Sequence, residues 1–175
     1  MTDGHNQSVV VRLVDPGDLG WIVEAAFTGG GTYKWSLRRR SPTPQMLETL
    51  LWSEVPLAAV IEVDERPALL LQLSRVDSIS GVAYLDVLLG PARPERISQI
   101  RPALSDFIDR GVQDFGLRLV YVEALESVWD LLEQIAGVQI PIEARLREHE
   151  RVGQGSFVDL LVGVVRRVDA PARLA

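Results

Sequence analysis

The chain has 175 residues, 47% of them hydrophobic and 24% charged, which indicates one folded domain with a full hydrophobic core. Its formal net charge of −6 argues against nucleic acid as the main partner. The lack of cysteine excludes disulfides and zinc–cysteine sites, and two histidines are too few for a histidine-rich site, so we expect no bound metal.

Neither a membrane span nor a secretion signal is visible in the sequence. No apolar run approaches the roughly 18 residues that a spanning helix needs, and the N-terminal segment MTDGHNQ is polar. We therefore expect a cytoplasmic protein without a membrane partner. Lys34 is the single lysine beside abundant arginine, a coding bias typical of a GC-rich bacterium. We expect one domain over residues 1–175, with flexible tails at 1–7 and 169–175.

The N-terminal half predicts strands joined by two helices and tight turns. Asp15-Pro16 is a helix-start signal, because aspartate caps a first turn and proline fits its first position. The sequences DERP and DSISG are turn signals between apolar runs, so we expect the strands around them to pair antiparallel. The predicted strands are Ser8–Val14, Leu57–Val63, Ala68–Val76 and Val82–Leu89. One predicted helix begins after Asp15, and the second spans Gln45–Trp52.

The stretch from Val82 to Glu126 predicts a strand, a turn, a helix and a second strand, Leu117–Ala124. Gly90-Pro91 ends the first strand, and Gly116 ends the helix as a residue that readily adopts left-handed backbone angles. Such a unit places a helix N-terminus beside a strand end, where unpaired N–H groups and the helix dipole attract phosphate. Apolar residues three or four apart form one stripe along the helix: Ile97, Ile100, Leu104, Phe107, Ile108, Val112 and Phe115.

The rest of the chain predicts one more helix and a hairpin. Ser127 is a candidate cap for a helix over Val128–Ala136. A long strand over Val138–Glu150, interrupted at Pro141, is followed by a final apolar strand over Ser156–Arg167. The sum is an α/β fold with a mixed, mostly antiparallel sheet of about seven strands flanked by about four helices.

This order of elements resembles the GNAT superfamily of N-acetyltransferases, and most of all the branch that acetylates the N-termini of ribosomal proteins. The tail pattern common in that branch, LR-x-H followed by spaced glycine and aspartate, is matched by Leu146, Arg147, His149, Gly153 or Gly155, and Asp159. The resemblance covers nearly the whole chain. It implies that acetyl-CoA or another acyl-CoA is the co-substrate and that an amine of a small molecule or peptide is the acceptor.

In the family, the two strands of the central unit diverge, and the thioester enters the gap. The first strand pairs through its backbone with the pantetheine arm, so the resemblance assigns Val87, Leu88 and Leu89 to cofactor binding. The family's phosphate loop has the pattern R/Q-x-x-G-x-G/A, but the matching segment here, Glu95–Ile100 (ERISQI), contains no glycine. Glycine lets a backbone approach a ligand closely. We therefore expect Arg93, Arg96 and Arg101 to compensate in part by contacting the phosphates by charge, with Ser98 in the same cofactor-binding loop. The alternative is that these arginines only solvate a helix end.

The segment Gly29–Pro44 combines three glycines, two aromatic residues and four positive charges. Glycines followed by aromatics suit a lid that closes over a ligand. In the family the corresponding connection walls the acceptor site, so the resemblance makes Tyr33 and Trp35 candidate substrate-binding residues. The positive charges suit an anionic group on the acceptor or the phosphates of coenzyme A. The alternative is a surface loop that Tyr33 and Trp35 anchor to the core.

Acylation of an amine needs a base, and acidic residues inside apolar strands are natural candidates, since burial raises a carboxyl pKa. Asp86 and Glu123 lie in the two central strands, which the resemblance places side by side, so both are candidate catalytic residues. The alternative for each carboxylate is a solvated position on the outer face or at the edge of the sheet. Many family members protonate the thiolate with a tyrosine near the position of Leu131 or Leu132, where this chain has none. His149 is another acid–base candidate, although a lone strand histidine is more often structural.

Two functions fit these observations. The first is an acyl-CoA-dependent N-acyltransferase, with acetyl-CoA, a longer acyl-CoA or a carrier-protein thioester as the donor. The second is a non-catalytic GNAT-like protein that binds a ligand or partner after losing the cofactor site, which the glycine-free loop and the missing tyrosine favour. The apolar final strand, Phe157–Val165, permits a homodimer, but burial in the core explains it equally well.

Overall fold

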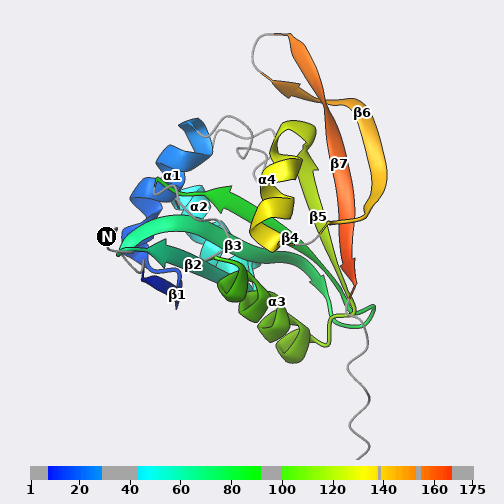
Figure 1. Cartoon of the computed structure of the whole chain (residues 1–175). Helices are drawn as coiled ribbons and strands as arrows, with labels where there is room; N and C mark the ends of the chain where they lie inside the picture. The colour runs from blue at the N-terminus through cyan, green and yellow to red at the C-terminus, as the bar shows by residue number, and fades with distance from the viewer. Residues whose placement is uncertain (1–7, 29–42, 92–99, 138, 153–154, 167–175) are drawn as a thin grey trace, which may run out of the picture.

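Figure 1 shows the computed structural model, which describes residues 8–28, 43–91, 100–137, 139–152 and 155–166. They form one seven-stranded sheet in the order β1-β2-β3-β4-β5-β7-β6. Every neighbouring pair is antiparallel except β4 and β5, which are parallel. This is the mixed, mostly antiparallel sheet that the sequence predicts. The strands are β1 (Val9–Leu13), β2 (Leu57–Val63), β3 (Arg66–Asp77), β4 (Val82–Leu89), β5 (Leu119–Leu125), β6 (Ile142–Val152) and β7 (Ser156–Arg166).

Helices cover both faces of the sheet. Within the described ranges they are α1 (Leu19–Thr28), α2 (Pro44–Thr49), α3 (Arg101–Phe115) and α4 (Glu126–Ala136). A 3-10 turn, η1 (Pro16–Asp18), precedes α1, and a π-helical turn, η2 (Leu50–Glu54), continues α2. None of these described helices is both long enough and apolar enough to cross a membrane.

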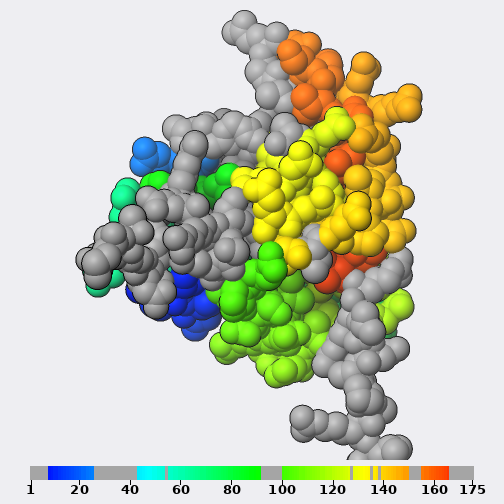
Figure 2. Space-filling view, in the orientation of Figure 1, coloured from blue at the N-terminus to red at the C-terminus, as the bar shows by residue number. Residues whose placement is uncertain are grey.

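The two faces carry separate apolar clusters. On one face α3 and α4 pack over the sheet through residues such as Phe107 and Trp129, and Figure 2 shows these two helices side by side on the surface. On the other face Ile22 of α1 and Leu47 of α2 pack against Leu70 and Leu88. Because side chains alternate along a strand, β3 is buried on both faces and forms the centre of the core.

Two predicted boundaries are wrong. α4 begins at Glu126 with Leu125 at the cap position, so Ser127 lies in the first turn and not at the cap. β6 begins at Ile142, because Pro141 has no N–H group for the ladder and therefore precedes the strand instead of interrupting it. The predicted tails, residues 1–7 and 169–175, lie outside the described residues.

The final strand is mostly part of the core. Leu160, Leu161 and Val164 on β7 are each only 2% exposed, whereas Phe157 near the hairpin end is 56% exposed. Core burial therefore accounts for most of the apolar run, and the homodimer stays a prediction.

An ion-pair cluster fixes the start of α1 to the edge of the sheet. Arg12 on β1 donates two hydrogen bonds of 2.7 Å to the carboxylate of Asp18 and one of 2.8 Å to Glu62 on β2. The side chain of Asp18 is only 3% exposed and also accepts a hydrogen bond from the indole of Trp21. Burial raises the pKa of Asp18, but the hydrogen bonds from Arg12, from the backbone of Asp15 and from Trp21 outweigh it, so the pKa lies below its ordinary value.

Removing Arg12 leaves this buried carboxylate without its cation. We expect Arg12→Ala to lower the free energy of unfolding at pH 7 by about 3 kcal/mol. The contribution of a carboxylate with a lowered pKa is present above its ordinary value of 3.8 and is lost as the pH falls through the lower folded-state value. The difference between wild type and variant should therefore shrink under acidic conditions, which chemical denaturation at several pH values measures.

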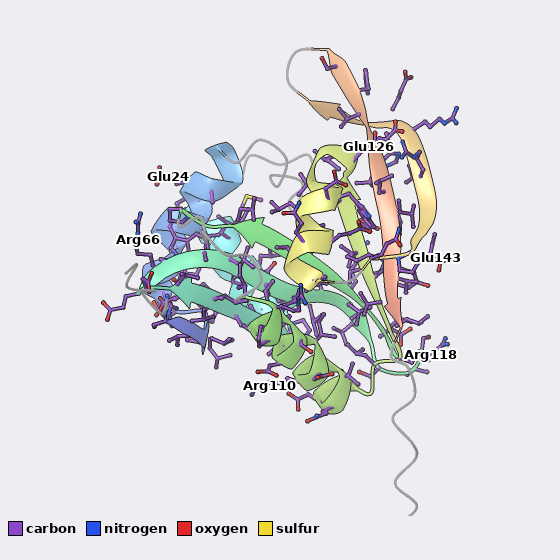
Figure 3. The ribbon with its side chains drawn as sticks, in the orientation of Figure 1. Glu24, Arg66, Arg110, Arg118, Glu126 and Glu143 are labelled. Atoms are coloured by element: carbon purple, nitrogen blue, oxygen red, sulfur yellow. The ribbon has the colours of Figure 1, made fainter. Side chains whose placement is uncertain are left out.

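Arg110→Ala is the matched control for this prediction. Arg110 lies on α3 (Figure 3) and pairs with Asp114 at 3.4 Å, but both side chains are at least half exposed. Such a surface pair contributes under ~1 kcal/mol. Equal losses of stability in the two variants would contradict the assignment of Asp18 as a buried, compensated charge.

Candidate active site

The parallel strands β4 and β5 separate partway along their length. Their residues pair from Val82 with Leu119 to Leu85 with Val122 and no further. Beyond that point β4 continues to Leu89 beside β3, and β5 continues to Leu125 beside β7. Figure 1 shows the two strands spreading apart from their common start. The divergence that the resemblance implied is present, and we call the region between residues 86–89 of β4 and 123–125 of β5 the fork.

β4 presents an unpaired backbone edge to the fork. The N–H of Gly90 donates to the carbonyl of Ala68 at the start of β3. Backbone groups alternate sides along a strand, so those of Leu88 also face β3, while the N–H and C=O groups of Val87 and Leu89 face the fork. Within the described chain, no strand pairs with this edge of β4.

The three β4 residues predicted to bind cofactor are thus not equivalent. Leu88 turns its backbone to β3, and its fully buried side chain packs in the cluster under α1 and α2. Val87 and Leu89 keep their backbone groups toward the fork, and their side chains are half-buried against the opposite cluster. Only the latter two residues are placed to pair with an extended ligand arm.

α3 begins close to the residues predicted to hold phosphate. Its first residue is Arg101, with Ile100 at the cap position and no side-chain cap among the described residues. Pro102 occupies the first turn, where its missing N–H removes one potential donor. The predicted contacts Arg93, Arg96 and Ser98 lie outside the described residues, as do Tyr33 and Trp35 of the predicted substrate loop.

Asp86 and Glu123 occupy equivalent places on the two strands. Each is the first residue after the last β4–β5 pair, and alternation puts both on the face that also carries Tyr84 and Tyr121. Asp86 accepts a hydrogen bond of 2.5 Å from the hydroxyl of Ser74 on β3. The side chain of Glu123 is 14% exposed, so neither residue has the fully solvated position that the sequence left open. The structure therefore places the two predicted carboxylates on one face of the sheet, each at the start of the fork.

Arg75 joins this group, although its sequence position gave no sign of it. The register between β3 and β4 shifts between Ser74 and Asp77, and Arg75 has a positive φ of 51°. A bulge of this kind re-aims a side chain. The guanidinium of Arg75 lies 3.3 Å from the ring centre of Tyr84 and 3.4 Å from the carboxylate of Glu123. Cation–π attraction and the ion pair together hold the arginine over the end of the fork.

Two aromatic rings complete this surface. Tyr84 and Tyr121 are opposite one another on β4 and β5, and their rings stack with centres 5.4 Å apart. They lie just before the fork, on the same face as Asp86 and Glu123. Their pairing could have been inferred from the sequences VAYLD and LVYVE only after the parallel register was known.

The other acid–base candidates are remote from the fork or structural. Asp159 on β7 accepts hydrogen bonds from the backbone of Glu148 and from Arg145, which lower its pKa. Arg145 also pairs at 2.8 Å with Glu126 at the start of α4 (Figure 3), so this group links the hairpin to the helix. His149 is exposed on β6. In the described part of the chain, no group of three or more metal-binding side chains is present.

The backbone of Arg75 offers a test of the bulge. A non-glycine residue in left-handed conformation is strained by roughly 1 kcal/mol or more, because its Cβ approaches the following carbonyl. We expect Arg75→Gly to be more stable than Arg75→Ala by about 1 kcal/mol in chemical denaturation.

Arg66 serves as the control because it is exposed, begins the same strand and has no positive φ (Figure 3). There the order should reverse, since glycine weakens an ordinary strand position by roughly 0.5–1 kcal/mol. The same order of stability at both positions would show that the bulge does not hold Arg75 in this conformation.

Comparison with known proteins supports the fold from structure alone. No family model and no curated protein sequence matches the chain. Among solved structures, a point mutant of the spermidine N-acetyltransferase SpeG from Vibrio cholerae matches with a TM-score of 0.73 and 14% identity, covering 90% of this chain and 93% of that chain. SpeG in complex with CoA and spermine matches with a TM-score of 0.70 and 15% identity, covering 90% and 95%.

These neighbours are not from the ribosomal-protein branch, so that part of the resemblance is not supported. The matches span nearly the whole of both chains, so the likeness is one of the complete fold. The chain therefore has the GNAT fold of the spermidine N-acetyltransferases.

Proposed function

We propose that this protein is an acyl-CoA-dependent N-acyltransferase, which transfers an acetyl group from acetyl-CoA to an amine. The observation that carries the proposal is the fork, where an unpaired edge of β4 adjoins two half-buried carboxylates. Solved structures of the same fold include one with CoA and spermine bound. An enzyme of this kind needs a slot for the thioester, a base and an acceptor surface, and each has a counterpart among the described residues.

The fork fits the arm of an acyl-CoA. The arm's amide groups are hydrogen-bond donors and acceptors, and they match the outward N–H and C=O groups of Val87 and Leu89 as an added strand would. The N-terminus of α3 favours the phosphates, since its dipole and unpaired N–H groups attract anions. Arg93 and Arg96 supply positive charge there and Ser98 a hydroxyl. Acetyl-CoA supplies the thioester that reacts.

Asp86 acts as the base in this proposal. The acceptor nitrogen, in its neutral form, attacks the thioester carbonyl carbon, a C–N bond forms as the C–S bond breaks, and the thiolate leaves with the electron pair. The proton lost by nitrogen goes to the Asp86 carboxylate, directly or through water. Ser74 orients that carboxylate through its hydrogen bond. Glu123 adds a second negative charge on the same face.

The acceptor is a small molecule or peptide that carries a positively charged amine. Asp86 attracts such a cation, and the ring of Tyr121 favours it further, whereas Arg75 already contacts Tyr84 and Glu123. SpeG binds spermine, a polyamine, which makes polyamines the first acceptors to test. Tyr33 and Trp35 are proposed to contact the acceptor from the substrate loop. The proposal also places the enzyme in the cytoplasm of a bacterium, as one domain that permits a homodimer.

Binding of acetyl-CoA tests the fork directly. We expect isothermal titration calorimetry to give a dissociation constant within the ~1 μM–1 mM range usual for such substrates. Val87→Pro removes an N–H that faces the fork without breaking the β3 ladder, so it should weaken binding about tenfold. Val87→Ala keeps the N–H and is the matched control.

Two results would count against this assignment. If Val87→Pro and Val87→Ala bind acetyl-CoA equally, the edge of β4 does not hold the arm. If the wild type shows no binding at millimolar acetyl-CoA, the enzyme proposal fails. The non-catalytic binding protein would then be the better account, as the glycine-free loop favours.

Asp86→Asn tests the chemistry apart from binding. The amide keeps the size of the side chain and can still accept the Ser74 hydrogen bond, but it cannot take a proton at neutral pH. We expect acetyl transfer to spermidine or another active amine to fall by about 10²–10⁴-fold, with the affinity for acetyl-CoA unchanged. Asp114→Asn on the exposed side of α3 controls for loss of charge. Near-normal activity of Asp86→Asn would exclude Asp86 as the base.

A further inference from the structure

One buried side chain in the centre of the sheet lacks the partners that burial normally requires. Gln72 on β3 is 0% exposed, and neither its amide nitrogen nor its amide oxygen has a hydrogen-bond partner among the described residues. Nearly all buried polar groups in folded proteins are paired with protein or with ordered water. An apolar residue would fill this position without that penalty, so the amide calls for a functional explanation.

The position of Gln72 in the sheet points to the fork. In the register, Gln72 is opposite Asp86 on β4 and opposite Ala58 on β2. Alternation puts Gln72 on the same face as Leu70, which belongs to the cluster under α1 and α2, and Ser74, which donates to Asp86. Gln72 therefore marks the boundary between the apolar cluster and the polar residues of the fork.

We propose that Gln72 holds a buried water molecule that bridges its amide to Asp86 and carries the proton from the acceptor amine to that carboxylate. This inference rests on the proposed function. Directly opposite residues of antiparallel strands have Cβ atoms about 5 Å apart, which one water can span when the side chains do not bond directly. A buried water typically needs two to four polar partners. The amide oxygen and nitrogen of Gln72, the carboxylate of Asp86 and the hydroxyl of Ser74 supply them.

The proton transfer balances in one step. As the C–N bond forms and the thiolate leaves, the nitrogen gives its proton to the water, and the water gives one of its own protons to Asp86. The water is regenerated, and the net change is one proton moved from nitrogen to carboxylate. Gln72 does not touch the reacting atoms in this scheme, so it is a positioning residue.

Gln72→Met is the variant that separates this role from simple packing. Methionine fills a similar volume without the amide. Because the bridging water and Asp86 then lose a hydrogen-bond partner, we expect the melting temperature to fall by about 2–4 °C. Because Asp86 loses a donor that favours its charged form, we expect the acidic limb of the pH–rate profile to move up by about one pH unit. The affinity for acetyl-CoA should not change.

The pH readout depends on the charges around Asp86. Among the described residues, the charged and titratable groups near Asp86 on this face of the sheet come from three strands. They are Arg75 on β3, Tyr84 on β4, and Tyr121 and Glu123 on β5. On the helices that cover this face, Glu24 of α1 and Glu48 of α2 are exposed. Gln72→Met alters none of these groups. A shift of the profile therefore reports the bridge to Asp86.

Leu70→Met is the matched control, because Leu70 lies two residues away on the same face and is also 0% exposed. It should lower stability slightly and leave the pH–rate profile in place. A crystal structure of the wild type should show electron density for a water between Gln72 and Asp86, a result that needs no activity.

The inference is overturned if Gln72→Met leaves the pH–rate profile unchanged, if it raises the melting temperature as removal of an unpaired amide would, or if no water lies between the two side chains. Failure of the proposed function looks different. In that case the wild type does not bind acetyl-CoA, whatever residue stands at position 72.

Discussion

The structure depends on where two parallel strands stop pairing. β4 is held to Leu89 by β3 on its outer side, and β5 is held to Leu125 by β7. Each strand follows its own antiparallel partner, and the twist of the sheet turns those partners apart. The parallel contact between β4 and β5 is therefore short and joins Val82–Leu85 with Leu119–Val122. The free edge of β4 and the neighbouring carboxylates are consequences of this limit.

The two faces of the sheet have different tasks. Under α3 and α4 the strands contribute apolar side chains such as Leu71, Leu85 and Val122, and the helices seal that face. On the other face the apolar cluster under α1 and α2 ends near Gln72, and polar residues take over toward β5. A boundary of this kind places charged groups next to low-dielectric packing, where they interact more strongly than in water.

Sequence patterns were sufficient for the elements but not for the composition of the site. β2 and β4 were predicted with their observed bounds, because turn residues flank clear apolar runs. Asp86 and Glu123 could be selected as acidic residues within apolar strands, and the resemblance put them side by side. The run LLLQLS in β3 is buried on both faces, so its alternation carries no signal for which face Gln72 occupies.

Arg75 shows a second reason why part of the site escaped prediction. Its side chain reaches Tyr84 and Glu123 only because a bulge turns the backbone to a positive φ. Arginine has no preference for that conformation, so the residue type gives no indication of it. The position of Ser127 was misjudged because β5 continues to Leu125 and α4 begins directly after it.

Under the proposed function, backbone recognition of the cofactor would explain how the fold remains recognisable while the sequence does not. Solved structures of the same fold share only 14–15% identity with the chain, and no family model matches it. A ligand arm that pairs with the N–H and C=O groups of Val87 and Leu89 places few demands on side chains, so those positions can drift. The phosphate loop is different, because glycine there sets how closely the backbone approaches. Its loss in ERISQI limits that approach, and Pro102 in the first turn of α3 lacks a backbone donor. The proposed function therefore assigns phosphate binding to arginine side chains instead of the backbone, while the fork itself needs no such compensation.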